Sequence, residues 1–205
     1  MQLTPEQKRQ KVWLEIKDLL LGAAFPLMMQ IVFSVSVILF ADYTAELAIR
    51  IIALVIGEVL LIGAYVIFGR QNGIAAVRRG VQSQKKRNAN SDDIKAYYKT
   101  GEYALYKGFL IALISTVPFI LFQFIECVAP NSVCAFMVKY AFGWAVYPFV
   151  LIGEACGGLS EWVNFVAIIF PVGIHAAAYY WGALKERKNQ QKVAEAQEIK
   201  AKRRK

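Results

Sequence analysis

Residues 47–69 read LAIRIIALVIGEVLLIGAYVIFG, and residues 70–87, RQNGIAAVRRGVQSQKKR, follow them directly. The first stretch is almost wholly apolar, and it exceeds the ~20 residues that a helix needs to cross a hydrocarbon core of about 30 Å. The second stretch is strongly basic. Because Lys and Arg collect on the cytoplasmic side of a membrane, this pair predicts a transmembrane helix whose basic end lies in the cytoplasm.

The same alternation of apolar and basic segments extends over the whole chain. Of its 24 Lys and Arg residues, 22 lie in three blocks, at 8–17, 70–107 and 185–205. The apolar runs between these blocks predict four membrane spans, at 19–40, 47–69, 108–128 and 162–182. With all basic blocks on one side, both termini are cytoplasmic, and the expected location is the cytoplasmic membrane, as a multi-pass protein.

Residues 135–153 are also apolar, but a fifth crossing would place the basic tail outside the cell, against the positive-inside rule. This run also holds residues that are unfavourable in a lipid-facing helix, namely Lys139, Gly143, Trp144, Tyr147 and Pro148. We therefore predict a re-entrant or interfacial helix on the outer side, packed against protein. A five-span form with one end outside is the alternative.

The predicted fold is thus all-α, a polytopic membrane bundle over 19–184. An amphipathic cytoplasmic helix over 1–18 precedes it, with Thr4 as N-cap, Pro5 at the first position and Gln7 three residues after the cap. Residues 70–107 are expected to form a cytoplasmic helical hairpin. A basic cytoplasmic tail, 185–205, completes the chain.

Glu58 is the strongest candidate for a binding residue, since an acid at mid-membrane costs at least ~2.5–3.5 kcal/mol and usually faces the bundle interior. The other spans supply polar residues at similar depth, which are Gln30, Ser115, Thr116 and His175. These five residues predict a polar midplane site, with Glu58 and His175 as its titratable pair. The alternative is that they are hydrogen-bonding contacts between helices.

Few chemical classes of site fit the remaining residues. A single His with no Cys at matching depth disfavours a zinc site, and we expect no metal or other cofactor. The absence of a recognisable catalytic motif disfavours an enzyme. Cys127 and Cys134 flank a short outer loop, so they predict either a disulfide that closes the loop or two free thiols. Arg50 is expected to pair with Glu46, four residues earlier.

The basic blocks predict contact with anionic lipid or with a polyanionic partner, at about 1 kcal/mol per residue near the surface. The residues expected to make it are Arg78, Arg79, Lys85, Lys86, Arg87, Lys202, Arg203, Arg204 and Lys205. A homo-oligomer, a larger membrane complex or a ribosome could be the protein partner. Sequence-specific binding of nucleic acid is not expected.

Three functions follow, in order of preference. The first is a transporter-like bundle, or a membrane subunit of a larger assembly, with the midplane site. The second is a membrane-insertion or assembly factor. Arg50 followed by the hairpin and the tail gives a layout that resembles that of the Oxa-type insertases, and the resemblance implies docking of a ribosome or acidic partner at hairpin and tail. The third is a lipid-processing enzyme with a site near Glu154 and Glu161.

Overall fold

The computed structural model describes residues 4–42, 46–89 and 103–203. These residues form helices and connecting turns, without a strand among them. The elements are α1 (Pro5–Asp42), α2 (Leu47–Ala89), α4 (Leu105–Val128), α5 (Ser132–Ala141), α6 (Gly143–Cys156), the 3₁₀ helix η1 (Glu161–Ile168) and α7 (Ile169–Arg203). Four helical stretches in the described part are long and apolar enough to cross a membrane. The all-helical class is confirmed for these residues, and the four stretches suggest a membrane protein.

The chain enters α1 through reciprocal hydrogen bonds. The Thr4 backbone N–H donates to Gln7 Oε1 at 3.0 Å, and the Gln7 N–H donates to Thr4 Oγ1 at 3.3 Å. This is a capping box, in which two otherwise unpaired amides at a helix start are satisfied, and it confirms the predicted cap. The expected amphipathic segment and first span then continue as one helix without a break at residue 18.

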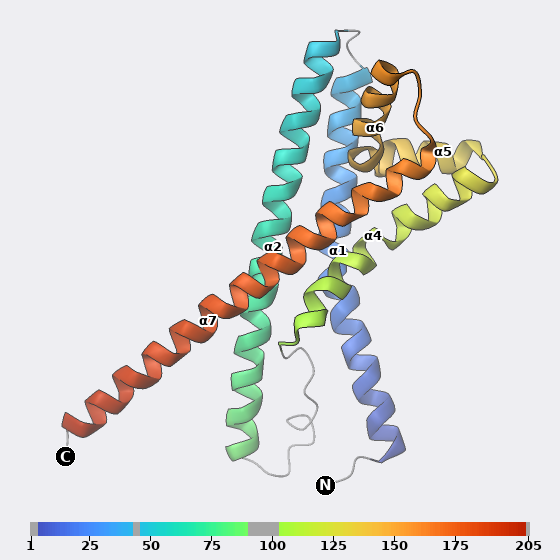
Figure 1. The fold of residues 1–205 in the computed structure, drawn as a ribbon. Helices are drawn as coiled ribbons and strands as arrows, with labels where there is room; N and C mark the ends of the chain where they lie inside the picture. The colour runs from blue at the N-terminus through green and yellow to red at the C-terminus, as the bar shows by residue number, and fades with distance from the viewer. Residues whose placement is uncertain (1–3, 43–45, 90–102, 204–205) are drawn as a thin grey trace.

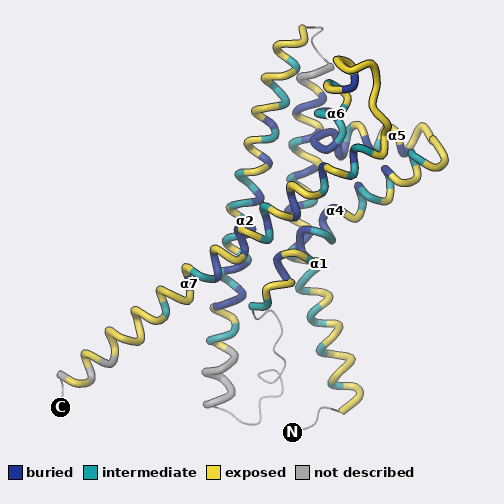
Figure 2. Tube along the Cα trace, viewed as in Figure 1, coloured by how far each residue is buried: buried dark blue, intermediate teal, exposed yellow. Residues whose placement is uncertain are grey.

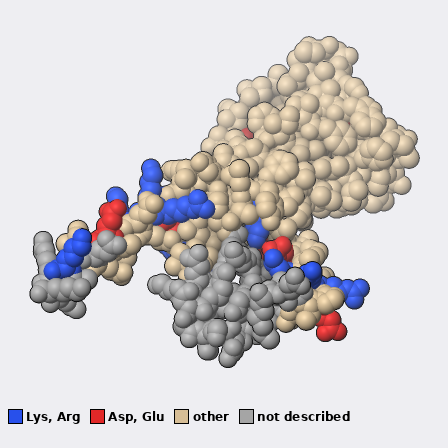
Figure 3. Space-filling model, turned by 60° about the horizontal axis from the view of Figure 1, so that its bottom comes forward, with Lys and Arg blue, Asp and Glu red and all other residues tan. Residues whose placement is uncertain are grey.

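The two ends of the bundle differ in charge. The start of α1, the end of α2 and the end of α7 lie at the bottom of Figure 1, and Lys and Arg gather over this part in Figure 3. We name it the basic end, and we name the opposite end, which holds α5 and α6, the apolar end. Part of the predicted hairpin, 90–102, lies outside the described residues, as do residues 204–205 and the side chains of 83–89 and 203.

Glycines bring α2 and α7 into very close contact where they cross. A β-carbon at Gly73 would overlap the carbonyl oxygen of Tyr179, and one at Gly182 would overlap that of Arg70. Gly69 and Ala178 face each other in the same crossing. Small residues four apart on both helices let the backbones approach, so van der Waals contact can hold the helices together where lipid removes the hydrophobic driving force.

The predicted element 135–153 is two helices, since α5 and α6 meet at an angle of 98° beside Phe142. The residues of this region that were unfavourable for a lipid-facing helix are mostly buried: Gly143, Trp144 and Tyr147 all lie in the interior. Phe142 and Trp144 pack on Phe119 of α4, with ring centroids 5.7 and 6.0 Å apart. The bent pair therefore contributes side chains to the core of the bundle.

Exposed residues recur along much of α1 and α2 (Figure 2), and many of them are large apolar residues. On α2 these include Ile52, Val59 and Ile67, each more than half exposed. A continuous apolar surface of this extent is unusual for a soluble monomer. It is the surface that a bilayer would cover.

Candidate functional site

The interior of the bundle contains hydrogen-bonded polar side chains from three helices. Gln30 of α1 is fully buried, and its Nε2 donates to the Tyr65 hydroxyl of α2. The same nitrogen lies 3.2 Å from the backbone oxygen of Ser115 in α4 and 3.3 Å from the Ser115 hydroxyl. A single amide thus links α1, α2 and α4.

His175 adds the fourth long helix, α7. Its ring stands edge-on to the Tyr65 ring, with centroids 5.9 Å apart, and its side chain is fully buried. Thr116 is buried as well, but its hydroxyl donates to the backbone oxygen of Leu113 in its own helix, at 2.9 Å. We define the polar cluster as Gln30, Tyr65, Ser115 and His175.

The polar cluster has unused hydrogen-bonding capacity. Gln30 Oε1 and both ring nitrogens of His175 are buried, and none of the described residues forms a hydrogen bond with them. Such groups cost about 1–3 kcal/mol each when left unpaired in a protein interior, so a partner that they can bond stabilises the site. The acceptor on Gln30 suits a proton donor or a small cation, while a neutral imidazole can donate through one nitrogen and accept through the other.

Glu58 lies apart from the polar cluster. It precedes Tyr65 by seven residues on α2, which is two turns or about 10 Å along the same helix face. Its Oε1 is buried and has no hydrogen-bond partner in the part of the chain that the structure describes. Within the described chain, no hydrogen bond or ring contact joins Glu58 to Gln30 or His175, so the structure brings Gln30, Ser115 and His175 together through Tyr65.

Tyr65 was missed in the sequence because a tyrosine near a helix end passes for an interfacial anchor. Its spacing was the available signal. Positions 58, 61 and 65 recur at helical intervals, and Leu61 and Tyr65 are both buried. Tyr65 is the residue that connects the cluster's other members.

Arg50 finds its partners in α6. Its Nε donates to the Tyr147 hydroxyl at 2.7 Å, and its Nη2 lies 3.4 Å from Glu154 Oε1. The guanidinium also stands over the Tyr147 ring, 5.5 Å from the centroid. The sequence pointed only to Glu46, because α6 is about a hundred residues away in the chain. These contacts fasten α6 to α2 at the apolar end.

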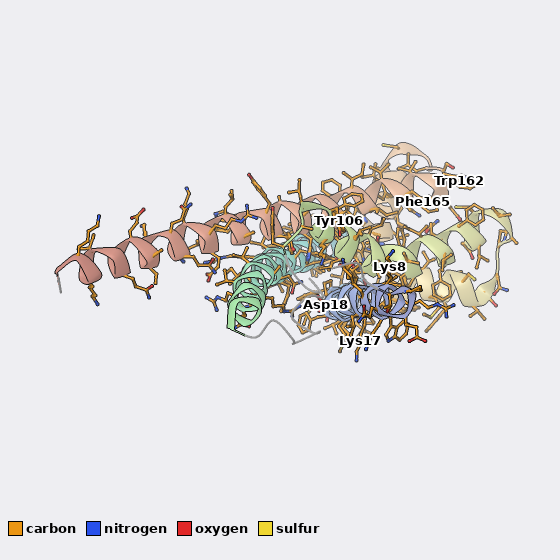
Figure 4. All side chains as sticks on the ribbon, turned by 90° about the horizontal axis from the view of Figure 1, so that it is seen from below. Lys8, Lys17, Asp18, Tyr106, Trp162 and Phe165 are labelled. Carbon is orange, nitrogen blue, oxygen red and sulfur yellow. The ribbon has the colours of Figure 1, made fainter. Side chains whose placement is uncertain are left out.

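Two basic residues that were predicted to contact lipid or a partner form ion pairs within the bundle. Arg79 donates to both carboxylate oxygens of Asp18 in α1, at 2.8 and 2.9 Å. Figure 4 shows Asp18 on α1 at the basic end. Arg78 donates to Glu186 of α7 at 2.8 and 3.3 Å. Both pairs connect helices. The exposed Arg79–Asp18 pair contributes only about 0–1 kcal/mol, whereas Glu186 of the other pair is buried.

The three cysteines are free in this structure. Cys127 lies 3.4 Å from Gln123 Nε2, and Cys134 is buried in α5, so the predicted disulfide between them is not present. Among the described residues, no three His, Cys, Asp or Glu side chains come together as a metal site.

Comparison with protein-family models, with curated proteins and with solved structures finds no match for this chain. The function proposed below is therefore inferred from the geometry of the bundle.

Proposed function

We propose that this chain is a small transporter-like membrane bundle, acting alone or as the membrane subunit of a larger assembly, that passes a proton or a small cation by way of the polar cluster and Glu58. The supporting observation is the set of unpaired polar atoms on Gln30 and His175 inside a bundle of apolar helices. Buried polar atoms in a membrane span usually belong to a binding site or an ion path.

The arrangement of Glu58 and His175 fits stepwise movement of the solute. His175 contacts Tyr65, and Glu58 lies about 10 Å further along α2 toward the apolar end. A proton or cation held at Glu58 would need water or a side-chain movement to reach the cluster. Four spans make a thin-walled bundle, so a second copy or a partner would complete the path.

Orientation is part of this proposal. The basic end would face the cytoplasm, because nearly all Lys and Arg lie there. The bent pair α5–α6 would then be a re-entrant element at the outer side, which keeps the number of crossings at four and returns the tail to the cytoplasm. Its burial against α4 supports this, since re-entrant backbone must be covered by protein.

Reconstitution into liposomes tests the proposal. The purified chain, with an imposed membrane potential and a pH-sensitive dye inside, should carry protons or a monovalent cation faster than empty liposomes do. Glu58→Gln and His175→Gln should each reduce the flux at least tenfold while the protein remains folded. Glu195→Gln, in the exposed part of α7, is the control and should leave it unchanged.

The opposite result has a clear meaning. If Glu58→Gln and His175→Gln have wild-type flux, or if the wild-type chain carries no ion, the polar cluster is a packing contact between helices. In that case Glu58→Gln is nearly silent, whereas Glu58→Leu destabilises the bundle.

A second candidate function, a membrane-insertion or assembly factor, is favoured by the shape of α7. Beyond Gln190 this helix projects from the bundle to Arg203 (Figure 1), and residues 191–197 are all exposed. A polar helix without tertiary contacts is marginally stable alone, so an acidic partner or anionic membrane would stabilise it. Salt-sensitive co-sedimentation with ribosomes that is lost on deletion of residues 187–205 would support this function over transport.

A further inference from the structure

A cavity of about 460 Å³ opens at the apolar end, between the end of α4, the bent pair α5–α6 and η1. Its volume falls in the range of about 300–1,000 Å³ that is usual for small-molecule sites. The apolar part of its wall includes Val138, Val146, Phe149 and Leu159. This cavity shares no lining residue with the polar cluster, and it is a separate candidate site.

Two buried amides form the polar part of the cavity wall. Asn164 Nδ2 donates to Gln123 Oε1 at 3.4 Å, and Gln123 Nε2 donates to the backbone oxygen of Glu161 at 3.3 Å. Both side chains are more than nine-tenths buried. These bonds fix the two amides in place and join α4 to η1, so the polar wall is pre-organised.

Charged side chains complete the cavity lining with an excess of negative charge. Glu126 and Glu161 line it together with Lys139. Glu126 Oε2 also accepts the Asn131 backbone N–H at 3.2 Å, which holds this carboxylate in place. Two carboxylates and one ammonium give the cavity a net charge of about −1, complementary to a cationic group.

The position of the cavity points to the bilayer as the source of its ligand. It lies where α4 ends and the last candidate span begins, which is the level of lipid head groups for a helix that crosses the membrane. Trp162 and Phe165 of η1 lie side by side at this end (Figure 4), with ring centroids 5.7 Å apart, and Phe124 of α4 meets Trp162 edge-on at 6.2 Å. Exposed Trp at a helix end is typical of the membrane interface.

We propose that this cavity binds a membrane lipid whose head group carries an ammonium, of the phosphatidylethanolamine class. An acyl chain contacts the apolar wall at Val146, Phe149 and Leu159. The ammonium lies against the carboxylates of Glu126 and Glu161. The negative charge of the head-group phosphate is complementary to the positive charge of Lys139.

Native mass spectrometry of the full chain in mild detergent tests this proposal, with phosphatidylethanolamine and phosphatidylglycerol supplied at equal concentration. The wild-type protein should retain phosphatidylethanolamine in preference. The double variant Glu126→Gln/Glu161→Gln should bind it at least tenfold more weakly. Glu195→Gln is the control, because it removes a carboxylate from the exposed part of α7, which contributes no residue to the cavity lining.

A second variant tests the cavity itself. Val150 lines the cavity and is 42% exposed, so Val150→Trp can fill the space without entering the core. It should lower the binding of phosphatidylethanolamine while thermal unfolding in the same detergent stays near that of the wild type. Soluble phosphoethanolamine should not displace the bound lipid, because it lacks the chain that occupies the apolar wall.

Three results would overturn the proposal. The first is equal retention of the two lipids by the wild-type chain. The second is wild-type binding of phosphatidylethanolamine by both the double variant and Val150→Trp. The third is displacement by soluble phosphoethanolamine, which would make the cavity a site for a free amine. None of these results depends on ion flux, so this test is independent of the polar cluster.

Discussion

Gly69 of α2 packs directly on the backbone of His175 in α7: a β-carbon at Gly69 would lie 2.8 Å from the His175 carbonyl oxygen. The close crossing of α2 and α7 therefore adjoins the residue that contributes α7 to the polar cluster. Because no side chain separates the two backbones, the position of the imidazole depends on that crossing.

Substitution of the crossing glycines by alanine should destabilise the bundle. Gly69→Ala and Gly73→Ala each force backbones apart, at a cost of about 1–3 kcal/mol as in other overpacked sites. Gly63→Ala and Gly173→Ala are matched controls, since a β-carbon at either position meets nothing within 4 Å. They should be neutral or stabilising by up to about 1 kcal/mol, the usual difference in helix propensity. Thermal unfolding in detergent measures the stability of all four variants. Equal changes in stability for the crossing and the control variants would contradict the close packing of α2 on α7.

The bond between Gln30 and Tyr65 should show energetic coupling. Tyr65→Phe removes the hydroxyl that accepts from Gln30, and Gln30→Leu removes the donor. Each single variant should cost about 1–3 kcal/mol because it leaves a buried polar group without its partner. A double-mutant cycle by unfolding in mixed micelles should give a coupling of about 0.5–1.5 kcal/mol. Additive effects of the two substitutions on the free energy of unfolding would show that this hydrogen bond contributes no stability.

Loss of the Arg50 contacts should loosen the bent pair. Tyr147→Phe removes the acceptor of the 2.7 Å bond, while the rest of the bundle is unchanged. Cys134 is buried in α5 and serves as a reporter once Cys127 and Cys156 are replaced by serine. Its alkylation should be about tenfold faster in Tyr147→Phe than in the parent, as expected for easier local opening. An unchanged rate would mean that Arg50 does not hold α6 in place.

Orientation can be measured with cysteines at the two ends. Cys156 is exposed at the apolar end, and Ala196 lies in the exposed part of α7 at the basic end. On a background without Cys127 and Cys134, Cys156 should react with an impermeant maleimide in intact cells. Ala196→Cys, in a chain that also lacks Cys156, should react only after the membrane is permeabilised. The reverse pattern would place the basic end outside and refute the proposed topology.

The sequence predicted those parts of the fold that depend on residues close together in the chain. The Thr4–Gln7 cap depends on residues three apart, and the long apolar stretches need only length and composition to be recognised. The bend at Phe142 has no such signal, because it results from how α5 and α6 pack on α4. Trp144 is buried for the same reason.

The site was less predictable than the spans, since its contacts join residues that are far apart in the chain. Their similar depth in the predicted spans correctly grouped Gln30, Ser115 and His175. Depth alone, however, does not tell which faces of the helices pack against one another. Gly69-x-x-x-Gly73 and Ala178-x-x-x-Gly182 were present in the sequence as signals for the α2–α7 crossing. Gly173-x-x-x-Ala177 is a pattern of the same kind, yet a β-carbon at Gly173 meets nothing within 4 Å, so the pattern alone does not identify a crossing.

The continuity of α7 has a mechanical consequence. One unbroken helix carries both His175 and the exposed tail, and Arg203 lies about 42 Å beyond His175 at 1.5 Å per residue. The close crossing at Ala178 and Gly182 lies between them, much nearer to the imidazole. A partner or membrane that holds the tail would therefore act on the same continuous helix that presents His175 to Tyr65.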